Sequence, residues 1–272
     1  MALHNPGPAW LFCPADRPER FEKAAAAADV VILDLEDGVA AADRQRAREA
    51  LVEVPLDPDR TVVRVNAFGT SDHVQDLQAL TRTGYDTVML PKCEAPEQVS
   101  ALAPRDVVVL VESPLGALHV IDTVRADNAV AVMWGAEDLF AVLGGTANRY
   151  ADGTYREVAR HVRSQSLLVA KAFGRLALDS VYLDIKDLDG LHREVDDAVA
   201  VGFDAKVAIH PSQVPVIRAG YLPTPDQVQW ARHVLTAAAD ERGVFAFGGI
   251  MVDAPVLRRA ERIVQLAADF GS

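Results

Sequence analysis

The chain has 272 residues, half of them hydrophobic, so it can bury one large core or two modest ones. Its formal net charge of -12 argues against nucleic acid and anionic membranes as partners, because an acidic surface repels phosphate groups. No apolar run approaches the roughly 20 residues of a membrane span, and the N-terminus does not have the pattern of a signal peptide, so we expect a cytoplasmic protein without a membrane partner.

Short apolar or β-branched runs alternate with longer amphipathic segments along most of the chain, which is typical of β/α proteins. The predicted strands are Ala9–Cys13, Val30–Leu35, Thr61–Val65, Thr87–Leu90, Val107–Val111, Ala129–Trp134, Ser180–Leu183 and Lys206–Ile209. Eight strands with helices between them favour an α/β fold of the (β/α)8 TIM-barrel type over an open sheet. No glycine pattern of a dinucleotide-binding fold or a P-loop competes with this interpretation.

Residues 154–173 are predicted to form one long helix, and the chain continues well beyond the eighth strand. This tail contains a predicted helix at residues 224–242, an apolar stretch at residues 243–252 that can form a hairpin-like flap, and a last helix from Pro255. We therefore predict a barrel domain at residues 1–220 and a helical C-terminal extension, or lid, at residues 221–272. The extension is too apolar for a disordered tail, so it should pack on another surface.

Polar or charged residues follow every predicted strand: Asp16, Arg17, Glu36, Asp37, Arg64, Asn66, Lys92, Glu112, Glu137, Asp138, Asp184 and His210. Any one of them alone is better explained as a cap or a loop residue than as a catalyst. In a barrel, however, these positions converge on one face, where the chemistry of this fold is placed. Their combination predicts a functional pocket.

Two of the predicted strands end in carboxylates, with Glu112 after one and Glu137 and Asp138 after the other. A hard divalent cation prefers such oxygen ligands on a rigid floor, although helix capping explains either stretch alone. Lys92 is interpreted as neutralising the neighbouring acids, and His210 as capping the next helix.

The two cysteines, Cys13 and Cys93, lie in strand-like runs. We expect them to be buried free thiols without a catalytic role.

Six ordered motifs are similar to those of a known family: Pro14–Lys23, Leu33–Gly38, Val63–Asn66, Leu90–Lys92, Gly135–Leu139 and Ile209–Gln213. Together they resemble the citrate lyase β-subunit-like branch of the HpcH/HpaI aldolase superfamily, and the resemblance extends as far as Pro255. It implies a (β/α)8 barrel that uses Mg2+, forms homotrimers or hexamers, and cleaves or forms a carbon–carbon bond in hydroxyacyl thioesters.

The resemblance implies a role for several strand-end residues. It assigns Glu112 and Asp138 as metal ligands, with Glu112 also near the substrate, and Arg64 as a contact for the substrate or its enolate. Glu36 and Asp37 are implied as acids around metal-bound water.

The resemblance also places Phe12, Arg17 and Lys23 at the nucleotide of coenzyme A. Arg17 and Lys23 are alternatively a solvated helix face, although an acidic protein needs local cations for an anionic ligand. Asp253 is implied as the general base, carried by a lid that reaches the pocket of a neighbouring subunit. Its alternative role is to cap the last helix.

These inferences predict a Mg2+-dependent lyase that cleaves citramalyl-CoA or a close relative to acetyl-CoA and an α-keto acid such as pyruvate. One alternative is the citryl-thioester lyase subunit of a citrate lyase complex, which acts on an acyl-carrier protein. Another is a catalytically silent barrel that serves as an assembly partner. The converging carboxylates argue against the silent barrel, because buried charges destabilise a protein that does not use them.

Overall fold

The computed structural model describes residues 7–240 and 243–270. Contacts divide the chain into two compact units, Met1–Ile217 and Arg218–Ser272. This boundary lies three residues before the one expected from the sequence, between residues 220 and 221. Among the described residues, no helix combines the length and apolar character needed to cross a bilayer.

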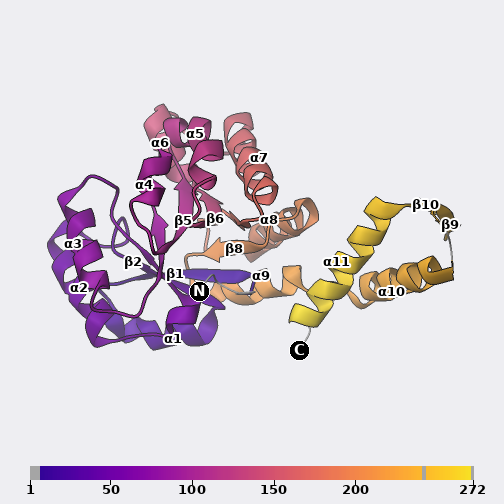
Figure 1. Ribbon diagram of the computed structural model, residues 1–272, viewed down its shortest axis with the longest axis horizontal. Coiled ribbons are helices and arrows are strands. Elements are labelled where there is room, and N and C mark those ends of the chain that lie inside the picture. The colour runs from indigo at the N-terminus through magenta and orange to yellow at the C-terminus, as the bar shows by residue number, and fades with distance from the viewer. Residues whose placement is uncertain (1–6, 241–242, 271–272) are drawn as a thin grey trace. The chain divides into compact units, whose positions relative to one another are not determined.

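The first unit is a closed barrel of eight parallel strands, with β1 paired to both β2 and β8 (Figure 1). The strands are β1 Ala9–Pro14, β2 Val30–Asp34, β3 Thr61–Arg64, β4 Thr87–Leu90, β5 Asp106–Val111, β6 Ala129–Trp134, β7 Leu176–Asp179 and β8 Ala205–Ala208. The helices are α1 Phe21–Ala27, α2 Arg44–Glu53, α3 Ser71–Leu80, α4 Pro96–Ser100, α5 Pro114–Val124, α6 Ala136–Leu143, α7 Glu157–Ala172 and α8 Leu188–Val201. A ninth helix, α9 Val214–Tyr221, begins in this unit and ends beyond its last residue. This architecture confirms the predicted (β/α)8 barrel.

The barrel interior is filled by side chains from alternate positions of the strands, such as Val30 and Ile32 of β2 and Val62 of β3. Successive side chains of a strand point to opposite faces, so these residues form inward-facing rows. The residues between them face the layer of helices. Both faces of a parallel barrel are covered, which explains why the strands are nearly continuous apolar runs in the sequence.

Strand β7 differs from its prediction, because it spans Leu176–Asp179 and not residues 180–183. The chain turns at Gly174, whose φ of +64° is in the left-handed region, and enters the strand directly. Asp179 ends the strand as a buried acid and accepts hydrogen bonds from Arg163 and Lys206. Asp184 is exposed and accepts a turn hydrogen bond from the amide of Lys186, so it does not follow a strand.

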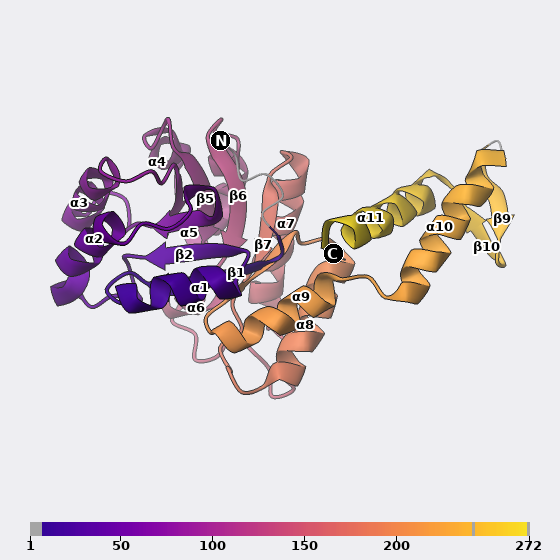
Figure 2. The ribbon, with the colours of Figure 1, turned by 90° about the horizontal axis from the view of Figure 1, so that it is seen from below.

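The second unit contains α10 Pro225–Asp240, β9 Phe245–Phe247, β10 Ile250–Val252 and α11 Ala254–Phe270. β9 and β10 form the predicted hairpin, and α10 and α11 lie side by side (Figures 1 and 2). Both residues of the tight turn, Gly248 and Gly249, have positive φ. A small core of buried apolar residues holds the unit together: Ala231, Val234, Val252 and Ala260.

Candidate active site

Three charged side chains continue the inward-facing rows at the C-terminal ends of the strands. Asp34 and Arg64 each come two residues after an apolar residue of the interior, and they are register partners on β2 and β3. Glu112 directly follows β5, two residues after the interior residue Leu110, and precedes the N-cap Ser113 of α5. All three are buried, so they form the floor of the barrel mouth.

Asp34 holds the guanidinium of Arg64 through two hydrogen bonds. Arg64 Nε donates to Asp34 Oδ1 at 2.7 Å, and Nη2 donates to Oδ2 at 2.6 Å. The third nitrogen, Nη1, lies 3.2 Å from Glu36 Oε2. The guanidinium carbon lies 4.7 Å from the centre of the Phe12 ring, which gives a cation–π contact on one side.

Lys92 connects the remaining acids of the mouth. Its φ is +50°, and it is the one non-glycine residue with positive φ in the described part of the chain. Its amide donates to Glu112 Oε1 at 2.9 Å. Its ammonium lies 2.5 Å from Glu36 Oε1, 3.3 Å from Asp37 Oδ2 and 3.6 Å from Asp138 Oδ1. These contacts agree with the neutralising role predicted for Lys92.

Negative charge exceeds positive charge at the barrel mouth. Burial, with the nearby charge of Asp138 and then of Glu36, raises the pKa of Glu112 to about 8. Burial also raises the pKa of Glu36, although Arg64 and Lys92 oppose the shift. For Lys92, burial favours the neutral form, but the hydrogen bond and charge of Glu36 outweigh it and the pKa rises. A cation would relieve the repulsion among these carboxylates.

The donors at the mouth fit a Mg2+ ion held by Glu112 and Asp138. Asp138 lies in the first turn of α6, and Gly135 is the N-cap of the same helix. A Cβ at Gly135 would lie 3.0 Å from Glu112 Oε2, so the start of α6 is close to the Glu112 carboxylate. Among the described residues, no group of three or more His, Cys, Asp or Glu side chains is arranged as a metal cluster. Two carboxylates completed by water or substrate oxygens are a usual environment for Mg2+, whereas a structural zinc site needs four protein ligands.

A buried oxygen at the mouth lacks a hydrogen bond. Within the described residues, Glu36 Oε2 accepts none, although Arg64 Nη1 is nearby. Buried carboxylate oxygens are normally satisfied by protein or water. Glu36 therefore has capacity for a ligand or water at the mouth. Asp37, the next residue, is more than half exposed and extends the acidic edge towards solvent.

The residues predicted for coenzyme A do not form one cluster. Phe12 is partly buried and packs against the interior core under Arg64. Arg17 is exposed, with Asp16 at 3.8 Å, and Lys23 is exposed on α1. Arg17 and Lys23 therefore lie on a solvated surface, where an anionic ligand has access to both.

Asp253 lies in the second unit, at the start of α11. Its side chain accepts a hydrogen bond from the amide of Val256 at 3.3 Å, and its carbonyl accepts one from Leu257. This is the capping geometry that the sequence left open as the alternative to a general base. His210 is also a cap, since its Nδ1 accepts a hydrogen bond from the amide of Ser212 at 3.2 Å.

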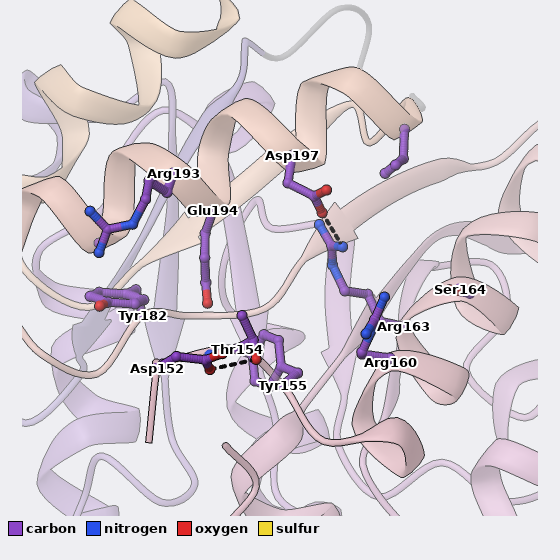
Figure 3. A pocket seen from close by; sticks show the side chains of 13 residues that line it. Asp152, Thr154, Tyr155, Arg160, Arg163, Ser164, Tyr182, Arg193, Glu194 and Asp197 are labelled. Atoms are coloured by element: carbon purple, nitrogen blue, oxygen red, sulfur yellow. Dashed lines mark hydrogen bonds and ion pairs between the residues drawn. The ribbon is translucent and has the colours of Figure 1, made fainter. Parts of the chain in front are cut away.

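A cavity of about 480 Å3 lies between α7, α8 and the loop at residues 152–155 (Figure 3). None of the predicted site residues is in its described lining. Several of its charged side chains already have protein partners, such as Arg163 with Asp197 and Glu194 with Lys206. The chemistry of the carboxylates and Arg64, and not cavity size, therefore identifies the barrel mouth as the candidate site.

Cys13 and Cys93 are buried free thiols, and burial raises the pKa of Cys13 to about 11 and that of Cys93 to about 12. Both are therefore protonated at neutral pH and are poor nucleophiles, as expected from the sequence.

Sequence reasoning missed Asp34, although it lies within one of the motifs. The signal was present in the alternation of β2, because Val30 and Ile32 face inward and Asp34 has the same parity.

Comparison with known proteins relates this chain to a family of aldolases and lyases. The family model described as HpcH/HpaI aldolase/citrate lyase matches residues 9–211. A citrate lyase subunit beta-like protein of Mycobacterium tuberculosis is 61% identical over 269 residues, covering 99% of this chain and 98% of that protein. The mitochondrial citramalyl-CoA lyase of Homo sapiens is 31% identical over 297 residues, covering 96% of this chain and 86% of that protein.

A solved structure also matches almost the whole chain. It is the crystal structure of CitE from Mycobacterium tuberculosis in complex with magnesium, acetoacetate and coenzyme A. The TM-score is 0.94 at 62% identity, and the match covers 96% of this chain and 98% of that one. With a family model matched over the whole barrel and relatives aligned along nearly the whole chain, this protein belongs to the HpcH/HpaI aldolase/citrate lyase family.

Proposed function

We propose that this chain is a Mg2+-dependent carbon–carbon lyase that cleaves a β-hydroxyacyl-CoA to acetyl-CoA and an α-keto acid. The substrate we propose is citramalyl-CoA or a close relative, which gives pyruvate. The observation that carries the proposal is the group of buried carboxylates around Glu112 beside the fixed guanidinium of Arg64. Support also comes from the relatives, one named a citramalyl-CoA lyase and one crystallised with magnesium and coenzyme A.

Cleavage between the α and β carbons of such a thioester has two requirements. A base must take the proton of the β-hydroxyl, and the negative charge that develops on the departing thioester enolate must be stabilised. When bound, Mg2+ supplies charge stabilisation and orients the oxygens of the substrate. Glu112 and Asp138 would hold it, while Arg64 presents Nη1 to the enolate oxygen or to a substrate carboxylate. Glu36 and Asp37 orient water at the same edge.

Coenzyme A is proposed to bind along Arg17 and Lys23, with Phe12 beneath the reacting end. The two cations are exposed and stand on an acidic protein, so they offer local attraction to the phosphates. We infer that Asp253 is the base and that it reaches the barrel mouth of a neighbouring copy in a cytoplasmic homotrimer or hexamer. A single closed site then needs residues from two chains.

A second candidate is the citryl-thioester lyase subunit of a citrate lyase complex, which the name of the 61% identical relative favours. It uses the same residues but a thioester on an acyl-carrier protein. A third candidate, a silent assembly partner, would leave the carboxylates of the mouth without use.

Turnover by the isolated chain separates the first candidate from the other two. Citramalyl-CoA, malyl-CoA and citrate are incubated with the chain, with and without Mg2+, and acetyl-CoA and keto acid are quantified by mass spectrometry. We expect Mg2+-dependent release of acetyl-CoA from a CoA thioester, and loss of that turnover in Glu112→Gln and Asp138→Asn.

The matched control is Glu137→Gln, because Glu137 adjoins Asp138 but is exposed and accepts a hydrogen bond from Asn148. It should retain activity. Full activity of Glu112→Gln or Asp138→Asn would remove those residues from the metal site. If the chain turned over neither CoA thioester, the proposed function would be rejected.

A further inference from the structure

Asp34 uses both of its carboxylate oxygens on groups that belong to the candidate site. Oδ1 accepts hydrogen bonds from Arg64 Nε at 2.7 Å and from the Glu36 amide at 3.0 Å. Oδ2 accepts hydrogen bonds from Arg64 Nη2 at 2.6 Å and from the Gly38 amide at 2.8 Å. A carboxylate offers about four acceptor positions, so Asp34 has no capacity left for a ligand.

The two hydrogen bonds from Arg64 determine which part of its guanidinium is available. Nε and Nη2 form the edge of the guanidinium that matches a carboxylate, and Asp34 occupies that edge. Nη1 is thereby directed towards Glu36, with the plane of the guanidinium above Phe12. Arg64 therefore presents one fixed nitrogen to the mouth, and not a freely rotating fork.

The same carboxylate anchors the turn that carries Glu36 and Asp37. Its two amide hydrogen bonds, from Glu36 and Gly38, lie on either side of Asp37. The turn passes so close to the carboxylate that a Cβ on Gly38 would lie 2.4 Å from Asp34 Oδ2, shorter than any normal contact. Glycine at position 38 thus allows the amide to reach the carboxylate.

We propose that Asp34 is a positioning residue that fixes Arg64 and the Glu36–Gly38 turn as one rigid unit. It acts through Arg64 and does not touch the substrate. The inference rests on the proposed lyase function for its kinetic readout, because Arg64 must contact the reacting groups for its orientation to matter.

The first test is a double-mutant cycle of Asp34→Asn and Arg64→Ala, measured as kcat/KM for the CoA thioester. Asparagine keeps the shape but places an NH2 group opposite one N–H of Arg64 and one backbone N–H, that of Glu36 or that of Gly38. Displacement of a reacting group by about 1 Å can lower the rate about 100-fold, so we expect a loss of about that size in the wild-type background. In the Arg64→Ala background, Asp34→Asn should lower kcat/KM by much less than 100-fold, because only the Glu36–Gly38 turn is then left for Asp34 to hold. Equal losses in both backgrounds would overturn the proposal.

Asp179→Asn is the matched control for the loss of a buried acid beside an arginine. Asp179 is 1% exposed and accepts hydrogen bonds from Arg163 and Lys206, but it faces the layer of helices. Its substitution should lower thermal stability while kcat/KM stays within about twofold of the wild type. An equal loss of kcat/KM in Asp179→Asn would assign the Asp34 effect to general destabilisation and overturn the proposal.

Gly38→Ala is a second perturbation that keeps the charge of Asp34 and is used if Asp34→Asn does not fold. Its methyl group must displace the carboxylate, so we expect a loss of kcat/KM in the wild-type background and a smaller loss in the Arg64→Ala background. Unchanged kcat/KM in folded Gly38→Ala would overturn the proposal.

A crystal structure of Asp34→Asn, or of Gly38→Ala if the first does not fold, gives a readout that is independent of turnover. A guanidinium of Arg64 that leaves its place above Phe12 supports the proposal, and an unmoved guanidinium overturns it. If the wild-type chain cleaves no thioester, the lyase function fails, and this structural result alone decides the role of Asp34.

Discussion

At the scale of single residues, Asp179 shows how the barrel keeps a buried charge for stability. It lies between Arg163 and Lys206 and also accepts a hydrogen bond from the indole of Trp134. Burial alone would raise its pKa, but the charges of Lys206 and Arg163 outweigh burial and lower the pKa to about 2. The ionised form is therefore favoured by the folded state.

This shift predicts the pH dependence of an Asp179→Asn variant. Because the pKa is lower in the folded chain than the usual aspartate value of 3.8, the stabilisation is present above pH 3.8 and is lost as the pH falls towards 2. At about 1.4 kcal/mol per pKa unit, the ionised form contributes about 2 kcal/mol at neutral pH. Urea unfolding should show Asp179→Asn less stable than wild type by at least this amount at pH 7, and a smaller difference near pH 3.

The control for this measurement is Asp197→Asn, since Asp197 also pairs with Arg163 but its side chain is 59% exposed. An exposed pair contributes only about 0–1 kcal/mol. A difference between wild type and Asp179→Asn that is the same at pH 7 and pH 3 would show that ionisation of Asp179 is not its source.

At the scale of elements, the segment from Arg17 to α1 is expected to serve coenzyme binding. Arg17→Ala and Lys23→Ala should raise KM for the acyl-CoA more than they lower kcat, because contacts with the nucleotide are equal in the ground and transition states. Each lost cation should raise KM severalfold, an effect of roughly 1 kcal/mol for an exposed pair. Steady-state kinetics with varied acyl-CoA concentration measures both constants.

Arg82→Ala is the matched control, because Arg82 is an exposed arginine just beyond the end of α3. In a β/α barrel this end of a helix lies at the face opposite the strand C-termini. The KM of Arg82→Ala for the acyl-CoA should equal that of the wild type. A fall in kcat with unchanged KM in Arg17→Ala and Lys23→Ala would remove the segment from coenzyme binding.

Most elements could be predicted because buried parallel strands are short apolar runs between amphipathic helices. The seventh strand was misplaced because its run, Leu176–Asp179, contains no β-branched residue and ends in a buried acid. The β-branched Val181 nearby gave a stronger local signal than this run. Pairing of Asp179 with Lys206, 27 positions away in the sequence, is a tertiary interaction that local pattern does not contain.

The candidate site could be predicted in part for the same reason. Strand ends identify Glu36, Arg64, Glu112 and Asp138 as residues that converge on one face. The structure places the three acids around Lys92 and Arg64 beside Glu36. The hydrogen bonds that orient Arg64 depend on register between β2 and β3, which the sequence does not state. The cap formed by Asp253 is a local contact, so both of its roles were visible in the sequence.

At the scale of the whole molecule, the proposed shared site predicts complementation between inactive chains. Asp253→Ala and Glu112→Ala should each lose activity, the former by about two to four orders of magnitude if Asp253 is a general base. Mixed oligomers, in which one chain provides Asp253 and another provides Glu112, should regain part of the wild-type rate. The rate is measured after subunit exchange has been verified by native mass spectrometry.

Asp253→Ser separates the base from the cap, because serine caps a helix nearly as well as aspartate but has no carboxylate. It should be as stable as the wild type and as inactive as Asp253→Ala, whereas loss of the cap alone reduces stability by about 1 kcal/mol. Mixed oligomers that remain inactive after exchange would contradict the shared site, and a fully active Asp253→Ser would leave Asp253 only its capping role.

The alternation of side chains along β2 and β7 limits how this barrel can change during evolution. Asp34 faces the interior and orients Arg64, whereas Asp179 faces the helices and pairs with Lys206. Deletion or insertion of one residue within β2 would turn Asp34 towards the helices and place Leu33 or Leu35 at the mouth. Loops between the strands can vary in length without this effect. Descendants of this chain are therefore free to acquire new loops, while its strands can gain or lose residues only in pairs.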